Sequence, residues 1–212
     1  GCLLPCRGEV EPLRRHADGL GVLGVHVDAE PAAVDLRRPQ LDQLEQLGFD
    51  FYVLDDKAYW TEQACYAFTA DQIDELEATT EELHELCLKA VEHVVANKLW
   101  ERMRIPPAWG DYIERVWRRS DPTIVGRFDL AYDGRNAPKL LEYNADTPTA
   151  LYEAAVVQWH WLKDTKPDAD QFNSIHEKLI EAWRGILARL PPEALVHFAR
   201  FEDHPEDLAT SE

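Results

Sequence analysis

Two short runs of alternating side chains on either side of an Asp-Gly turn most constrain how this chain folds. Side chains alternate between the two faces of a strand, so Arg127 and Asp129 share one face of the first run. Glu142 and Asn144 share one face of the second. The antiparallel register that pairs Asp129 with Glu142 also pairs Arg127 with Asn144, and it leaves residues 134–137 as a loop of common hairpin length. The pattern predicts a hairpin that gathers these four side chains on one face.

The facing carboxylates of Asp129 and Glu142 need a positive charge between them. Opposed like charges repel across a sheet, and a hard divalent cation with oxygen ligands would neutralise both. Asn144 offers a further oxygen ligand, and Arg127 offers a charge that cannot be titrated away. Two alternatives stay open: Arg127 alone neutralises the pair without a metal, or the acidic pair is simply a solvated face.

The segment after the second run predicts a helix beside these side chains. Thr147 is expected as its N-cap and Pro148 at the first helical position, where the missing N–H costs nothing. The run from Ala150 to Leu162 has core-forming helical spacing. A helix start carries free N–H groups and partial positive charge. We therefore expect cation, arginine and helix N-terminus to converge on a spot that suits a phosphate or carboxylate group.

These motifs resemble the glutathionylspermidine synthase-like family of ATP-grasp ligases. The resemblance is carried by RFD followed by LLEYNADTPTALYEAAVVQWHWL, and it extends over LGFDFYVLDDKAYWTEQACYAFT and ATTEELHELCLKAVEHVV. Characterised members join a carboxylate to an amine with ATP. The resemblance implies a mixed α/β, pre-ATP-grasp-like fold, in which helices flank a small mixed sheet with a metal-site β-hairpin.

The resemblance also implies roles for the hairpin residues. Asp129, Glu142 and Asn144 match the magnesium ligands, and Arg127 matches the arginine that contacts the reacting phosphoryl group. The implied reaction uses ATP and Mg²⁺ to phosphorylate a peptide-like, glutathione-type carboxylate. A polyamine-like amine then attacks the acyl phosphate, so no side-chain nucleophile is needed. The family positions that hold the peptide substrate fall at Asp146, Thr147 and Thr149.

The ends of the chain depart from the family pattern. The family's nucleotide-binding lysines lie well downstream of NADTPT, and this chain stops at Glu212. We therefore expect an incomplete piece of a longer ligase, inactive by itself, whose C-terminal ATP-grasp portion belongs to the same protein. Residues 1–35 do not resemble the family, and they are expected as an N-terminal extension of a domain at 36–212.

Two other functions stay open beside the ligase. One is a non-catalytic binding or scaffolding remnant that kept the fold. The other is a metal-dependent hydrolase that uses the pair of Asp129 and Glu142. The hydrolase ranks lowest because no general base is evident near NADTPT, and no convincing Ser/His/Asp or Cys/His arrangement is found.

Composition excludes other classes of function. A net charge of −18 argues against nucleic-acid binding, because phosphate backbones demand a basic surface. The acidity either serves solubility or favours cationic substrates such as polyamines. No stretch approaches the ~18 apolar residues of a membrane span, and no secretory signal pattern opens the chain. A cytoplasmic location is therefore expected, and four cysteines are too few for a disulfide scaffold.

A glycine motif at Gly19, Gly21 and Gly24 does not indicate a dinucleotide site. That fingerprint needs a strand before it and a helix after it, whereas here the following VLGVHVD alternates like a strand. The remaining elements are expected as a helix over 39–47 ended by Gly48, a strand over 49–54, a long helix opened by a capping box of Thr69 and Gln72, helices over 109–117 and 173–190, and a strand over 194–201.

Overall fold

A computed structural model describes residues 2–5, 22–25, 45–46, 48–54, 57–60, 65–145, 149–200 and 208. The strands are β1 (Cys2–Pro5), β2 (Val22–Val25), β3 (Val53–Leu54), β4 (Lys57–Ala58), β5 (Cys65–Phe68), β6 (Arg127–Ala131) and β7 (Lys139–Asn144). The helices are α2 (Ala70–Ala96), the 3-10 turn η1 (Pro107–Trp109), α3 (Gly110–Arg119), the π-helix η2 (Glu153–Val157), α4 (Gln158–Thr165) and α5 (Ile175–Leu187). None of the described helices is long and apolar enough to span a membrane.

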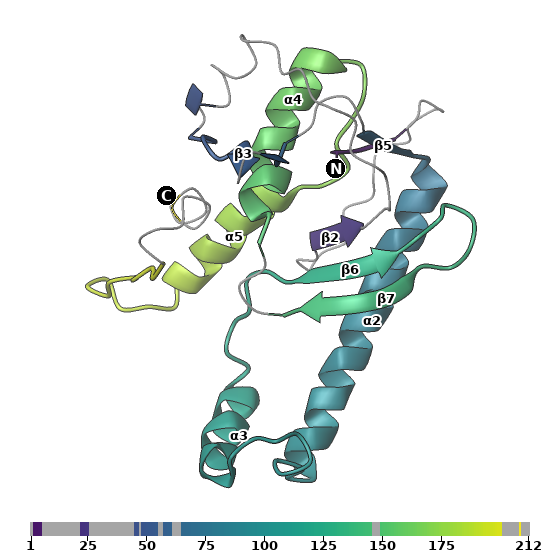
Figure 1. Ribbon diagram of the computed structural model, residues 1–212. Coiled ribbons are helices and arrows are strands. Elements are labelled where there is room, and N and C mark those ends of the chain that lie inside the picture. Colours follow the sequence, from purple (N-terminus) through teal and green to yellow (C-terminus); the bar gives the residue numbers. More distant parts are fainter. Residues whose placement is uncertain are drawn as a thin grey trace.

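The central sheet is small and mixed, as expected for the mixed α/β class. Its order is β2-β6-β7, in which β2 runs parallel to β6 and β6 runs antiparallel to β7. Two further ladders join β1 to β5 in parallel and β3 to β4 in antiparallel. Helix α2 crosses one face of the hairpin, and α4 and α5 lie toward the end of the hairpin at which β6 begins (Figure 1). Residues 2–5 and 22–25 thus pair with strands from later in the chain.

The expected register of the hairpin is confirmed at the end that carries Arg127 and Asp129. Asp129 pairs with Glu142, and Arg127 pairs with Asn144. Beyond Asp129 the register shifts, so that Leu130 pairs with Leu140. One extra residue in one strand forms a bulge, which strengthens the local twist.

The loop expected at residues 134–137 is wrong, because the ladder ends earlier. β6 stops at Ala131 and β7 begins at Lys139. Asp133 forms a turn of its own between them, accepting hydrogen bonds from the backbone N of Arg135 at 2.9 Å and of Asn136 at 2.8 Å. Such a side-chain turn competes with strand pairing, so the connection is longer than parity suggests.

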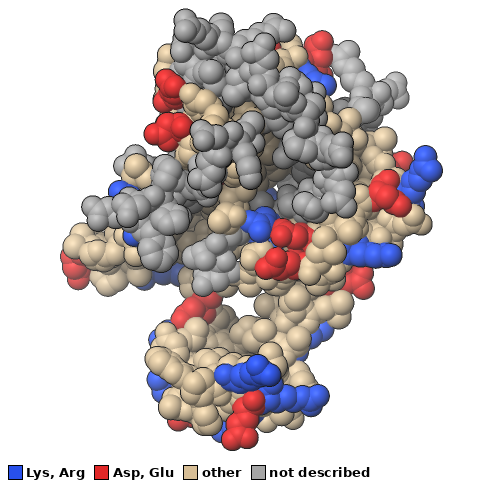
Figure 2. Space-filling model, viewed as in Figure 1, with Lys and Arg blue, Asp and Glu red and all other residues tan. Residues whose placement is uncertain are grey.

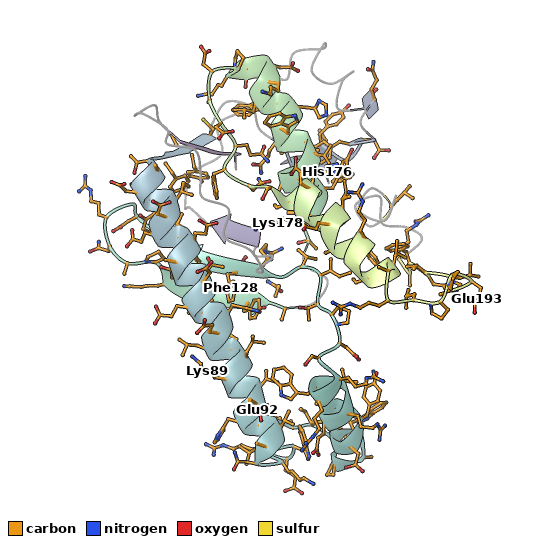
Figure 3. All side chains as sticks on the ribbon, turned by 180° about the vertical axis from the view of Figure 1, so that it is seen from behind. Lys89, Glu92, Phe128, His176, Lys178 and Glu193 are labelled. Atoms are coloured by element: carbon orange, nitrogen blue, oxygen red, sulfur yellow. The ribbon has the colours of Figure 1, made fainter. Side chains whose placement is uncertain are left out.

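The inner face of β6 builds one hydrophobic core with α2. Phe128 and Leu130 alternate with the polar residues of the strand and are buried, and Phe128 points from β6 toward α2 (Figure 3). They pack with Ile73 and Leu76 of α2. On β7, the Tyr143 ring stacks on Phe128 with centroids 3.9 Å apart. This packing leaves the opposite face of the hairpin for its polar side chains.

A second core joins the β3–β4 segment to the helix that follows the hairpin. The buried side chains that form it are Phe49, Phe51, Trp60, Val157, Trp161 and Leu162. Only residues 53–54 of the strand expected over 49–54 pair in a ladder. The buried Phe49 and Phe51 instead pack edge to face, with ring centroids 4.5 Å apart. Packing of these side chains in the core, and not strand pairing, therefore determines the conformation of residues 49–52.

The capping box at the start of α2 is confirmed, with Gln72 N donating to Thr69 Oγ1 and Thr69 N donating to Gln72 Oε1. Gln72 Nε2 also donates to the carbonyl of Gly134 at 2.9 Å, which ties the hairpin turn to the helix. The far half of α2 continues past the sheet and carries α3 beside it (Figure 1). We call residues 70–119 the arm.

Several expected boundaries shift, and one element is wrong. The helices expected over 109–117 and 173–190 are observed as α3 and α5. Of the helix expected over 39–47, residues 39–44 and 47 lie outside the described residues; residues 45–46 are helical, and Gly48 has a φ of +79°. No strand forms over residues 194–200, where Leu195 is 78% exposed. An alternating apolar pattern pairs only when a neighbouring strand is present, and the described residues offer none there.

Candidate functional site

Arg127 and Asp129 form an ion pair on the polar face of the hairpin. Alternation with the buried Phe128 and Leu130 directs both side chains away from the core. Arg127 Nε donates to Asp129 Oδ1 at 2.8 Å, and Arg127 Nη2 donates to Asp129 Oδ2 at 3.3 Å. Their side chains are 20% and 26% exposed. The prediction that these two side chains share one face of the strand is confirmed.

The same guanidinium reaches the segment that follows β7. Arg127 Nη1 donates to the carbonyl oxygen and to Oγ1 of Thr149, each at 3.0 Å. Thr149 therefore lies beside the hairpin. Asp146 and Thr147, the other two residues expected to hold substrate, lie outside the described residues.

The helix after the hairpin begins later than expected. Ala150 has a φ of +64°, in the left-handed region, so it cannot belong to the helix. Helical structure starts at Leu151, passes through the π-helix η2 and continues as α4 to Thr165. The helix start expected at Pro148 is wrong, and Pro148 itself lies outside the described residues, as does the proposed N-cap Thr147.

The surroundings hold Arg127 in its charged form. The hydrogen bonds that Arg127 donates to Asp129 are the largest influence and raise the Arg127 pKa above its usual range, against a smaller opposing effect of burial. The charge of Asp129 adds to this rise, followed by those of Glu142 and Tyr59. Arg127 thus supplies a permanent positive charge at this face.

Glu142 and Asn144 each have side-chain polar atoms without a hydrogen-bond partner among the described residues. Glu142 is exposed, and it makes no hydrogen bond or ion pair within the described part of the chain. The Asn144 side-chain amide has a buried Nδ2 without a hydrogen-bond partner. Buried polar atoms are rarely left unpaired, and turning the amide over would present an oxygen instead. Together with Asp129, these groups fit a hard cation.

A cation at this face would need ligands from outside the protein as well. The described residues contain no group of three or more His, Cys, Asp or Glu side chains placed to hold a metal ion. Two carboxylates and one amide oxygen therefore leave positions open. Magnesium commonly keeps such positions for water and substrate phosphates.

Tyr59 and Glu153 lie near Arg127: Tyr59 is among the groups that raise the Arg127 pKa, and it is hydrogen-bonded to Glu153. The sequence analysis did not predict either residue. Tyr59 Oη donates to Glu153 Oε1 at 2.6 Å, and Glu153 is only 7% exposed. The π-helix that carries Glu153 is tied down at Ala154, whose carbonyl accepts from Gln171 Nε2 at 2.9 Å and from Asn173 Nδ2 at 3.3 Å. π-helical turns are frequent at functional sites. A lone acidic residue in the apolar run LYEAAVVQW was the available signal.

Comparison with known proteins identifies relatives of the whole domain. The sequence matches the family described as glutathionylspermidine synthase preATP-grasp over residues 32–212. A putative acid–amine ligase from Haemophilus influenzae is 44% identical over 172 residues, which cover 79% of this chain and 43% of that protein. Glutathionylspermidine synthase from Crithidia fasciculata is 26% identical, with 68% of this chain and 21% of that protein covered.

A bifunctional glutathionylspermidine synthetase/amidase from Escherichia coli is 29% identical, and the match covers 67% of this chain and 23% of that protein. In each of these three comparisons, the chain spans less than half of the relative's length.

Proposed function

This chain belongs to the glutathionylspermidine synthase preATP-grasp family, and from that premise we propose that it forms the phosphate-facing part of an ATP-dependent carboxylate–amine ligase. The observation that carries the proposal is the hairpin register, which sets Asp129 opposite Glu142 and Arg127 opposite Asn144. Acidic, amide and guanidinium groups on one face suit a nucleotide phosphate with its cation.

In this proposal Asp129, Glu142 and Asn144 hold Mg²⁺. The ion would neutralise negative charge on the phosphates of ATP. The opposed carboxylates gain from such a cation because they otherwise repel across the sheet. Asn144 completes the set with a neutral oxygen, which takes the place of the buried, unpartnered Nδ2 when the amide is turned over.

Arg127 would bind the phosphoryl group that passes to the substrate carboxylate. Its Nη1 is already held by Thr149, and its Nε by Asp129. A guanidinium fixed in this way needs little reorganisation when charge develops near it. Thr149 would place the carboxylate substrate beside Arg127, with Asp146 and Thr147 as further contacts.

The substrates are proposed as a peptide-like, glutathione-type acid and a polyamine-like amine. Two relatives are named for glutathionylspermidine synthesis. The net charge of −18 is consistent with a cationic amine, because an acidic surface attracts cations. ATP would activate the acid as an acyl phosphate, which the amine then attacks.

A non-catalytic binding role is the second candidate. It is favoured by one observation: Arg127 already neutralises Asp129 through two hydrogen bonds. A protein that had lost its chemistry would keep such a pair, because it stabilises the hairpin without any cation.

The deciding experiment uses the complete gene product with glutathione, spermidine, ATP and Mg²⁺, and measures ADP release and amide formation. Glu142→Gln keeps size and removes one charge, so we expect turnover to fall about 100-fold or more. Glu193→Gln is the matched control, because Glu193 lies past α5, far from the hairpin (Figure 3). Near-normal turnover in Glu142→Gln would exclude the magnesium role, and absence of turnover in the unsubstituted protein would favour the binding role.

A further inference from the structure

The end of the arm exposes aromatic and basic side chains together. Trp109 is 57% exposed, Tyr112 54% and Met103 54%. Arg102 and Arg104 flank Met103; both are exposed, and neither makes an ion pair within the described part of the chain. Trp, Tyr, Met and Arg are the residue types enriched at protein interfaces and at their energetic hot spots.

The net charge at this end is positive, whereas that of the whole chain is negative. Residues 98–119 carry six Lys or Arg against three Asp or Glu, whereas the whole chain has a net charge of −18. Lys and Arg side chains gather on the end of the molecule that holds α3 (Figure 2). We call residues 98–119 the basic end.

The basic end is built as a rigid surface. Trp100 is buried beneath it, and Gly110 lets α3 approach so closely that a Cβ there would lie 2.5 Å from Trp100 Nε1. Ile105 N donates to the Trp100 carbonyl at 2.8 Å, which closes the turn. Surfaces that are ordered before binding lose less entropy when a partner docks.

The other half of the arm has the complementary charge. Residues 71–92 hold eight Asp or Glu against one Lys. Four of the acids lie three or four residues apart, which places them on one face of α2; this acidic row consists of Asp74, Glu77, Glu81 and Glu85, all exposed.

The acidic row leads along α2 toward α3. At the same spacing it continues through Leu88, 43% exposed, to Glu92. Glu92 accepts a hydrogen bond from Trp117 Nε1, so α3 stands beside the lower part of this row. Glu92 lies near the α3 end of the helix (Figure 3). The upper part of the row is exposed to solvent.

We propose that two copies of this chain pair through their arms in opposite directions, with the basic end of each copy on the acidic row of the other. The acidic row lies on α2 and the basic end follows it in the same arm, so a two-fold axis between two arms satisfies both contacts at once. Helix α2 has 27 residues, or roughly 40 Å at the rise of an α-helix, enough to separate the two contacts. Leu88 and Val91, 43% and 40% exposed, lie between the two contacts, where the α2 helices of the two copies meet at the two-fold axis.

The first test is sedimentation velocity of the unsubstituted chain across concentration and ionic strength. We expect a dimer at low salt that dissociates near ~1 M salt, where the Debye length is about 3 Å. Arg102→Glu/Arg104→Glu is expected to weaken self-association about tenfold or more. Arg184→Glu/Arg189→Glu makes the same change of charge on and just after α5 and is expected to leave the dimer intact. Circular dichroism checks that each variant folds.

The second test mixes two variants. Glu77→Arg/Glu81→Arg reverses the acidic row, so this variant and the one with the reversed basic end should each be monomeric alone. Mixed together they restore both contacts, and a heterodimer is expected. The proposal is overturned by a chain that stays monomeric at low salt, by equal loss in the Arg184→Glu/Arg189→Glu control, or by a mixture that does not associate.

Discussion

Arg127 and Asp129 neutralise each other on one face of β6, with Arg127 Nε and Asp129 Oδ1 2.8 Å apart. Removing the guanidinium leaves the Asp129 carboxylate opposite Glu142 with no cation between them. We expect Arg127→Met to lower the free energy of unfolding by about 1–2 kcal/mol, since the pair is only partly buried and solvent screens it. Urea denaturation measures the loss.

The control for this prediction removes the stranded charge as well. Asp129→Asn in the Arg127→Met background should recover part of the lost stability, because only one carboxylate then remains at the hairpin face. The double-mutant cycle isolates the coupling between the two residues. Strictly additive losses would show that the ion pair contributes nothing to the hairpin.

Tyr59→Phe should destabilise the protein through the carboxylate it leaves behind. Glu153 is 7% exposed and accepts the Tyr59 hydroxyl hydrogen bond at 2.6 Å. A buried acceptor that loses its donor costs about 1–3 kcal/mol, measured as a shift of the urea midpoint. Tyr66→Phe is the matched control, because the Tyr66 hydroxyl has no hydrogen bond among the described residues. Equal effects in the two variants would contradict this role of Tyr59.

The pairing of the candidate site was predictable because it depends on local rules. Strand alternation and a single register were enough to set Asp129 opposite Glu142 and Arg127 opposite Asn144. The same rules failed at the turn. There, Asp133 accepts backbone hydrogen bonds and ends the ladder early, which parity does not reveal.

The features that were not predicted depend on contacts and backbone conformations that no local sequence pattern shows. Tyr59 and Glu153 are 94 residues apart in the chain, and no local pattern links them. The late start of the helix depends on Ala150, whose left-handed backbone is unusual for a residue with a side chain. The strand expected over 194–201 had the right alternation, yet a strand also needs a neighbour, and periodicity does not supply one.

Gly110 should tolerate no side chain, in contrast to Gly185. A Cβ at Gly110 would lie 2.5 Å from Trp100 Nε1, and Trp100 is buried. We expect Gly110→Ala to cost about 1–3 kcal/mol through overpacking. Gly185 lies within α5 with nothing within 4 Å of a Cβ, so Gly185→Ala should stabilise by about 0.5–1 kcal/mol. Opposite shifts in melting temperature are the expected readout, and a shared direction would refute the packing argument.

Asp133 should make stability depend on pH at the acid end. Hydrogen bonds from the Asn136 backbone and side chain, then from the Arg135 backbone, lower the Asp133 pKa from 3.8 to about 2. The folded state therefore prefers the charged carboxylate, and its contribution is fully present above the unfolded value. That contribution is lost as pH falls through about 2, because the unfolded chain then takes up the proton first.

The measurement compares the unsubstituted chain with Asp133→Ala by urea denaturation at intervals from about pH 5 to 2. Asp133→Ala has no carboxylate to titrate, so the gap in unfolding free energy between the two proteins should be constant above pH 4 and should narrow below it. The titration of the Asp133 carboxyl carbon, followed by NMR, should give a midpoint near the lowered pKa. A gap that stays constant through the acid range would mean that the turn does not distinguish the charged from the neutral side chain. The early end of the β6–β7 ladder would then need another cause, such as the hydrogen bond from Gln72 to Gly134.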